Sequence, residues 1–476
     1  MLSSFSLLRP FSRVHATIFG ALVLLTLAFT YRSAFNHRSW ASLQPGSTSV
    51  RQEHLVNFGK SLFTALEQTA PPVRALTRNG DAGAFTFWKA TSTTPRPDLV
   101  PMQPDEVVAM NQAHDSYLEK IKGLRLPYRA RTQGIVSTAG GKYLPIFVIS
   151  LRMLRRTGCT LPVELLLVTE NDHAPYLCDT VLPSLNARCV VLEDYLGSKA
   201  VTMAKYQFKI FAILFSSFED VLFLDADSFL VRDPQDALTQ EPFQSAGLVT
   251  WPDFWASSAS KHLYAVQGIP VPPMDAHASS ESGQLIVSKR SHARVLLLAT
   301  YYNFYGPDHY YQLLSQGGPG QGDKETFLGA AEAMSAPFYQ VKKCVDILGY
   351  QGEDGYHGTA MLQYDPAHDT PGSYGQDNAT PFAVHHNFPK LDPVDLLGAD
   401  GAAIHHGSGI YHRLIGEKNI TEMHFGRDLE QEMWQEMEYV TCELGDKFKH
   451  WRALPTTQWK KGTCDMVKEF QKAIFS

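Results

Sequence analysis

Short apolar runs alternate with amphipathic segments between residues 130 and 231, and this alternation limits the possible folds more than any other feature of the sequence. "YLPIFVISLRMLRRTG" (143–158) is expected to be a helix that ends at Gly158. "VELLLVTE" (163–170) is a continuous apolar run, as in a parallel strand covered on both faces. Repeated strand–helix–strand units predict an α/β fold with a doubly wound, mostly parallel sheet. Ligands of such sheets bind at the carboxyl ends of the strands.

Two carboxylates stand at one of these predicted strand ends. "VLFLDADSFLV" (221–231) carries Asp225 and Asp227 directly after an apolar run. Two ionised carboxylates close together are costly to bury and repel each other, so either water or a cation must compensate them. Residues i and i+2 of a strand point to the same side, so both side chains can reach one divalent cation. Mg²⁺ and Mn²⁺ prefer oxygen ligands and leave positions open for phosphates, which favours a metal-bridged diphosphate.

Three interpretations of this pair compete. The first is a solvated turn at a strand end. The second is the nucleophile motif of a haloacid-dehalogenase-type phosphatase, but that motif requires a downstream acidic pair, and "GDKETF" (322–327) lacks the second aspartate. An aspartate pair beyond residue 220 is also late for that fold. The third interpretation, a nucleotide-sugar glycosyltransferase, predicts further motifs downstream, and these are present.

Five segments in a fixed order resemble one known family. "LFLDADSF" contains the aspartate pair, "ESGQLIVSK" is a turn that leads into an apolar strand, and "HHNFPKLDP" follows another strand. Together with "TWPDFW" and "GDKETF", they resemble the fungal Golgi mannosyltransferases of glycosyltransferase family 71. The branch they resemble contains the α-1,2-mannosyltransferases that start side branches on the N-glycan outer chain. The resemblance covers about residues 130–425.

This resemblance implies a GT-A-type nucleotide-sugar-binding fold and an enzyme that transfers mannose from GDP-mannose to a mannan or N-glycan acceptor, through α-1,2 bonds or, as the alternative, α-1,3 bonds. It also implies retention of the α configuration and Mn²⁺ (or Mg²⁺) as cofactor. Asp225 would contact ribose or metal, Asp227 would bind the metal, and Lys390 would offset the diphosphate charge. A third metal ligand is implied from His385 or His386, and both remain open because neighbours on a strand point to opposite faces.

A carboxylate or carbonyl that faces the departing mannosyl cation is a further implication of the resemblance. In a retaining transferase the acceptor attacks on the face from which GDP leaves, so an oxygen on the opposite face stabilises the oxocarbenium-like state. The candidates are, in this order, Asp323, Glu325 and Glu281.

Other donor contacts are expected from the first strand and from a helix before the aspartate pair. The first strand ends in Val136, Ser137 and Thr138, where the first βα turn usually contacts the nucleotide. The segment 204–220 is predicted to be a helix with a stripe of phenylalanines that ends at Phe218. Lys209 in this segment either binds the donor, as the related class implies, or stands on a solvated helix face.

The N-terminal region differs in composition from the rest of the chain. Residues 14–31 are apolar and about long enough to span a bilayer, so a retained signal-anchor is preferred over a cleaved signal peptide. Residues 1–13 are then a cytosolic tail. Residues 32–105 are rich in Ser, Thr, Pro, Gly and Gln and are expected to form a stem that contains a short helix. Residues 106–476 are the expected lumenal catalytic domain of a single-pass type II Golgi membrane protein, which is open to association in a Golgi mannosyltransferase complex.

Cysteines and charge exclude several other functions. The six cysteines contain no CxxC pair, so a zinc site is not expected, and one to three disulfides would suit an oxidising lumen. Two N-glycosylation triplets, at Asn378 and Asn419, support the same compartment weakly. A formal net charge of -6 without a basic stripe gives no reason to expect nucleic-acid binding.

Two other functions are kept beside the mannosyltransferase. One is a glycosyltransferase that uses another nucleotide sugar, such as UDP-glucose or UDP-galactose. The other is a non-catalytic glycan-binding subunit of a mannosyltransferase complex, although the intact aspartate pair and "HHNFPK" argue against it.

Overall fold

The structure is a computed structural model that describes residues 45–203, 205–369, 379–398, 401–405, 409–453 and 462–476. The expected tail, the signal-anchor and Asn378 lie outside these residues. The chain divides into two compact units, Met1–His54 and Leu55–Ser476. Within the described ranges, no helix is both long and apolar enough to cross a bilayer.

The second unit begins well before the catalytic domain that the sequence predicts. Helix α2 (Pro45–Gln68) buries an apolar stripe from Leu55 onward, and its Phe58 ring packs on Phe215 with centroids 5.5 Å apart. Val100, in the segment 32–105 that is expected to form the stem, is also fully buried. Residues from Leu55 onward therefore belong to one compact unit, which begins inside the segment 32–105 that the sequence assigns to the stem.

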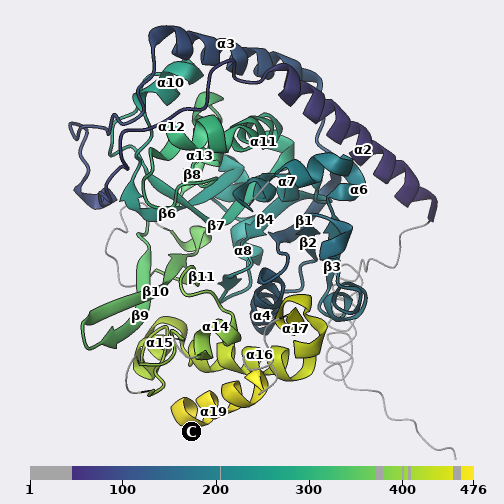
Figure 1. Cartoon of the computed structure of the whole chain (residues 1–476), viewed down its shortest axis with the longest axis vertical. Helices are drawn as coiled ribbons and strands as arrows, with labels where there is room; N and C mark the ends of the chain where they lie inside the picture. The colour runs from purple at the N-terminus through teal and green to yellow at the C-terminus, as the bar shows by residue number, and fades with distance from the viewer. Residues whose placement is uncertain (1–44, 204, 370–378, 399–400, 406–408, 454–461) are drawn as a thin grey trace, which may run out of the picture. The chain divides into compact units, whose positions relative to one another are not determined.

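A seven-stranded sheet forms the centre of the second unit (Figure 1), with the strand order β3-β2-β1-β4-β7-β6-β8. Neighbouring strands run parallel from β3 to β4, β7 runs antiparallel to both β4 and β6, and β8 is parallel to β6. The predicted α/β class and the mostly parallel sheet are confirmed. The strands are β1 (Arg129–Thr138), β2 (Val163–Leu167), β3 (Ala187–Val191), β4 (Phe218–Leu224), β6 (Leu248–Ala256), β7 (Ala278–Ser288) and β8 (Tyr339–Gln340).

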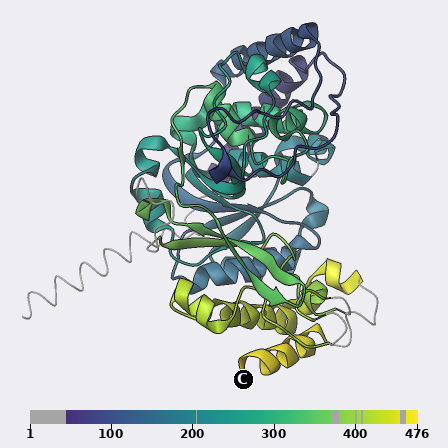
Figure 2. The same ribbon diagram turned by 90° about the vertical axis from the view of Figure 1, so that its left-hand side faces the viewer.

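A second, four-stranded antiparallel sheet has the order β5-β11-β10-β9. Its first strand follows the aspartate pair directly, whereas its other strands come from the last third of the chain. In Figure 2 the green strands of this sheet lie next to the yellow-green C-terminal helices. The strands are β5 (Ser228–Leu230), β9 (Asp346–Gly352), β10 (Gly355–Tyr364) and β11 (Pro381–His385).

Helices cover both faces of the central sheet (Figure 1). Helices α7 (Phe208–Phe215) and α11 (Lys289–Phe304) pack together on one face, and α4 (Tyr143–Arg156) and α16 (Leu429–Leu444) pack together on the other. The segment 204–220 is not helical throughout, because Phe218 already begins β4. The remaining helices are α3 (Pro104–Lys120), α5 (Leu182–Ser184), α6 (Glu193–Leu196), α8 (Gln235–Thr239), α9 (Phe243–Ala246), α10 (Lys261–Gln267), α12 (Tyr311–Ser315), α13 (Thr326–Ala333), α14 (Pro393–Leu397), α15 (Lys418–Phe425), α17 (Lys449–Ala453) and α19 (Thr463–Phe475).

Two disulfides form, within the predicted range. One joins Cys178 to Cys189, and the other joins Cys442 in α16 to Cys464 in α19. Cys159 and Cys344 remain thiols, and Cys159 is buried.

Candidate functional site

The two aspartates lie between the central sheet and the second sheet. Asp225 follows β4, and its backbone N–H donates to the carbonyl of Gly283 in β7 at 2.8 Å. Asp227 precedes β5, and its carbonyl accepts from the backbone N–H of His386 at 2.9 Å. Strand β11 pairs with β5 so that His385 stands opposite Ser228. The pairing of the two strands thus brings a histidine from the C-terminal region to the aspartate pair.

Asp225, Asp227 and His385 form one cluster. Each offers a ligand atom, and these atoms all lie within 4.8 Å of one another. The His385 Nε2 lies 3.4 Å from Asp227 Oδ1, and both side chains are nearly buried. Two carboxylates and one imidazole are a donor set that suits Mn²⁺, because carboxylate oxygen satisfies a hard cation and imidazole suits transition metals. The three residues therefore fit the divalent metal that the sequence predicts.

His386 lies outside this cluster. Its Nδ1 donates to the Pro389 carbonyl at 2.6 Å. Burial lowers the pKa of His386 to about 4. Adjacent residues along a strand point to opposite faces, and His385 is the one that faces Asp227. The structure therefore places His385, and not His386, at the site.

Positive charge surrounds Asp227. Lys390 Nζ donates to Asp227 Oδ2, whereas His385 faces the other carboxylate oxygen, Oδ1. Burial alone would raise the pKa of Asp227, but His385 and Lys390 overcome it and hold the pKa well below its usual range. Asp227 is therefore ionised at neutral pH and ready to accept a metal.

Lys209 holds a second group of acids together. Its Nζ lies 3.2 Å from Asp225 and 3.1 Å from Asp323, and it donates to the carbonyl and hydroxyl of Ser282 at 2.6 and 2.8 Å. The side chain is only 6% exposed. Burial alone would lower the pKa of Lys209, but Asp225, Asp323 and Glu281 raise it. The alternative of a solvated helix face is therefore wrong for Lys209.

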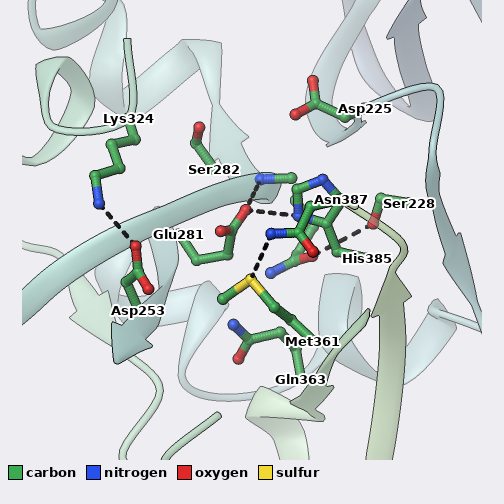
Figure 3. Close-up of polar contacts among 12 residues, drawn as sticks. Asp225, Ser228, Asp253, Glu281, Ser282, Lys324, Met361, Gln363, His385 and Asn387 are labelled. Atoms are coloured by element: carbon green, nitrogen blue, oxygen red, sulfur yellow. Dashed lines mark hydrogen bonds and ion pairs between the residues drawn. The ribbon is translucent and has the colours of Figure 1, made fainter. Parts of the chain in front are cut away.

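Glu281 faces the histidine. Its Oε1 lies 3.0 Å from His385 Nδ1 and also accepts the backbone N–H of Gly283. Figure 3 shows Glu281 between His385 on one side and the Lys324–Asp253 pair on the other, with Asp225 above the imidazole ring. Burial alone would lower the pKa of His385, but Glu281 and Asp227 overcome it and raise the pKa to about 10.

The sequence of the whole chain has clear relatives. A family model described as mannosyltransferase matches residues 132–277 and 273–365. The alpha-1,2-mannosyltransferase MNN2 of Saccharomyces cerevisiae is 30% identical over an alignment of 443 positions, gaps included, that covers 76% of this chain and 73% of that protein. The chain belongs to the MNN2/MNN5 family of alpha-1,2-mannosyltransferases. The family predicted from the five ordered segments is thereby confirmed.

Other members of the MNN2/MNN5 family match over smaller shares. MNN24 of Candida albicans is 37% identical over an alignment of 303 positions, gaps included. The alignment covers 55% of this chain and 43% of that protein, so this chain spans less than half of that relative. MNN21 of the same organism is 32% identical and is covered over 62% of its length. Among solved structures, the glycosyltransferase GlyE of Streptococcus pneumoniae overlaps 44% of this chain and 46% of its own at 15% identity, with a TM-score of 0.30. That score is too low to support a conclusion.

The acids that the sequence predicts to face the mannosyl cation lie near Lys209 and β7 in this member of the MNN2/MNN5 family. Asp323 is the acid paired with Lys209. Glu325, at the start of α13, accepts from the hydroxyl of Ser279 and from the backbone N–H of Ser280 at 3.0 Å. Burial raises the pKa of Glu325. Glu281 thus lies in β7, whereas Asp323 and Glu325 lie on the neighbouring segment before α13, and the catalytic roles of all three remain predictions.

Sequence reasoning missed two charged residues and one hydroxyl here. Lys324 Nζ lies 2.7 Å from Asp253 Oδ2, and both side chains are nearly buried. Ser282, the third, binds Lys209. Asp253 and Ser282 lie inside "TWPDFW" and "ESGQLIVSK", so the family motifs themselves carried the signal.

The residues predicted to contact the nucleotide lie at the end of β1. Val136 pairs in register with Phe223 of β4, so the end of β1 is the immediate neighbour of the strand that carries the aspartates. Val136 and Ser137 are buried and Thr138 is half-buried. A nucleotide contact from Val136 would therefore come from its backbone, and this contact stays a prediction for all three residues.

Proposed function

We propose that this protein is a metal-dependent retaining α-mannosyltransferase that transfers mannose from GDP-mannose to an α-mannoside, forming α-1,2 bonds on N-glycan outer chain or cell-wall mannan. The observation that carries the proposal is the convergence of Asp225, Asp227 and His385, with Lys390 beside them, in a chain of the MNN2/MNN5 family. The mostly parallel sheet and the position of the acids at the ends of its strands support the GT-A-type assignment.

Asp225, Asp227 and His385 would hold Mn²⁺, which when bound supplies positive charge to the diphosphate. Lys390 would bind a diphosphate oxygen and stabilise the negative charge that develops as GDP leaves. Its ammonium is half-exposed and already faces the metal ligands, so it can exchange Asp227 for phosphate without a large movement.

The transfer itself breaks the bond between the anomeric carbon and the β-phosphate oxygen and forms a bond from that carbon to the acceptor oxygen. The acceptor hydroxyl attacks on the face from which GDP leaves, and its proton passes to the departing diphosphate. Asp323 and Glu325 are the acids that would stabilise the oxocarbenium-like state from the other side. Val136, Ser137 and Thr138 would contact the nucleotide, and Lys209 would orient Asp225 and Asp323 around it.

The proposed location is the Golgi membrane, with a single N-terminal anchor and a lumenal catalytic unit, and association with other mannosyltransferases is part of this proposal. The two disulfides suit an oxidising lumen. Asn419, in an exposed position of α15, is available for glycosylation. Protease protection of the full chain in isolated microsomes, with and without detergent, tests this orientation.

The decisive experiment is an assay of the full chain, purified in detergent, with Mn²⁺ and an α-1,6-mannan oligomer. GDP-mannose, UDP-glucose and UDP-galactose are offered in parallel, and the product linkage is read by NMR. Mannose on the 2-position of the acceptor is the expected result. Transfer from UDP-glucose or UDP-galactose but not from GDP-mannose would show that the proposed donor is wrong. Absence of transfer from all three donors would favour the non-catalytic glycan-binding subunit.

A further inference from the structure

The His385 ring is held from both of its nitrogens. Nδ1 lies 3.0 Å from Glu281 Oε1, and Nε2 lies 3.4 Å from Asp227 Oδ1. All three residues are buried, with at most 8% of each residue exposed, so water has little access to these contacts. With Nδ1 donating to Glu281, Nε2 is the nitrogen that faces Asp227, and it can bind a cation once the cation has displaced its proton.

Gly283 provides the space for this arrangement. A Cβ built on Gly283 would lie 2.4 Å from His385 Nδ1, so the ring occupies the volume that any side chain at this position would need. The backbone N–H of Gly283 donates to Glu281, and its carbonyl accepts the backbone N–H of Asp225 at 2.8 Å. One short segment of β7 therefore contacts both the imidazole and an aspartate of the cluster.

We propose that Glu281 and Gly283 are positioning residues for the metal site, where Glu281 fixes the tautomer and direction of His385 and Gly283 admits the ring. This inference rests on the proposed metal-dependent function. It differs from the sequence-based expectation that Glu281 faces the mannosyl cation. A carboxylate behind a metal-binding histidine orients the ring and makes it a better ligand, and loss of such a partner lowers metal affinity by about 10- to 100-fold.

The contacts of Glu281 separate this role from a direct catalytic one. Glu281 Oε1 is used twice, by the imidazole and by the Gly283 N–H. Burial alone would raise the pKa of Glu281, but His385 and the Gly283 N–H overcome it and lower the pKa. A glutamine at this position can still accept both hydrogen bonds through its amide oxygen, whereas an alanine can accept neither.

The test is a titration of the full chain, in detergent and with GDP present, by Mn²⁺ followed by electron paramagnetic resonance. Glu281→Ala and Gly283→Ala should weaken Mn²⁺ binding by about 10- to 100-fold. Glu281→Gln should stay within a few-fold of the parent because it keeps the hydrogen bond to His385.

Two matched variants serve as controls. Glu332→Ala removes the carboxylate from a second, partly buried Glu–His pair, in which His277 Nε2 lies 3.0 Å from Glu332. Gly123→Ala adds a methyl group where no atom lies within 4 Å. Both should leave Mn²⁺ affinity unchanged, and circular dichroism should show that every variant is folded.

The outcomes separate the inference from the proposed function. Parent-like Mn²⁺ affinity in folded Glu281→Ala, with a loss of kcat in both Glu281 variants, would overturn the positioning role and make Glu281 a catalytic acid. Weakened Mn²⁺ binding in Glu281→Ala and Gly283→Ala, together with transfer from a nucleotide sugar other than GDP-mannose, would support the positioning role and show that the proposed donor is wrong. A parent protein that binds no Mn²⁺ would overturn both.

Discussion

The Lys209 ammonium nitrogen lies 3.1 Å from Asp323 Oδ2, inside the protein and far from Asp323 in sequence. The same nitrogen lies 3.2 Å from Asp225. One buried cation therefore joins the acid after β4 to the acid before α13. Loss of the positive charge of Lys209 would therefore affect both Asp225 and Asp323 at the proposed donor site.

Replacing Lys209 with methionine should destabilise the protein. The variant keeps an apolar stem of similar length but leaves Asp225 and Asp323 without their shared cation. Removal of one partner from a buried ion pair costs about 3–5 kcal/mol, so the free energy of unfolding in urea and chelator should fall by that amount. Lys261→Met is the control, because Lys261 forms an exposed pair with Asp98 at 2.5 Å and should change stability by less than about 1 kcal/mol.

Replacing Asp227 with asparagine should abolish metal-dependent transfer. Asparagine has nearly the same shape but leaves Lys390 and His385 without the charge that faces them. We expect kcat/KM to fall by at least about 10²-fold and Mn²⁺ binding to weaken, whereas chelation of the parent should remove activity that added Mn²⁺ restores. Asp446→Asn, at an exposed site, should behave as the parent. Transfer that survives both Asp227→Asn and chelator would contradict a metal-dependent mechanism.

Glu430 should make stability depend on pH. It accepts from the backbone N–H groups of Leu414 and Ile415 at 2.6 and 3.0 Å and lies near Arg413. Burial raises the pKa of Glu430 to about 7, although Arg413 and the N–H groups act to lower it. A raised carboxyl pKa means that the folded state holds a proton which the unfolded state has lost, so this contribution to stability is present below about pH 4.5 and is lost as pH rises toward 7.

The comparison of Glu430→Gln with the parent isolates this effect, since glutamine does not titrate. Between pH 4.5 and 7.5 the parent should lose roughly 2–3 kcal/mol of unfolding free energy relative to the variant. Urea unfolding at several pH values measures the difference. A constant difference across this range would show that Glu430 is ionised throughout.

The disulfide between Cys442 and Cys464 should contribute measurably to stability. It joins α16 to α19, which also meet where Trp434 stacks on Phe470 with ring centroids 3.9 Å apart. Replacing both cysteines with serine should lower the free energy of unfolding by about 2–4 kcal/mol. Cys344→Ser should have little effect because Cys344 is a free thiol. An equal melting temperature for parent and double variant under oxidising conditions would refute this contribution.

Local sequence patterns predicted the parts of the fold that depend on local structure. The apolar run at 163–170 became β2, and the i, i+2 spacing of Asp225 and Asp227 placed both carboxylates in one cluster. Phe218 was misplaced because its spacing continues the helical stripe while its neighbours also suit a strand. Leu55 and the residues that follow it show helical spacing, but composition alone could not reveal the surface on α7 that buries them.

Local sequence patterns could not predict the parts of the site in which residues far apart in the sequence contact each other. Glu281 contacts His385 across 104 residues, and Lys209 is buried by acids that come later in the chain. Strand alternation showed that His385 and His386 point to opposite faces, yet only the pairing of β11 with β5 decides which one meets Asp227. Family motifs located these residues without revealing their contacts.

The pairing of β5 with β11 has a consequence for biosynthesis. A ribosome delivers both aspartates long before the imidazole that completes their cluster, so a nascent or truncated chain that stops before β11 carries an unfinished ligand set. Cation capture would then occur only after the smaller sheet has closed, and it would stabilise the finished polypeptide over its incomplete forms.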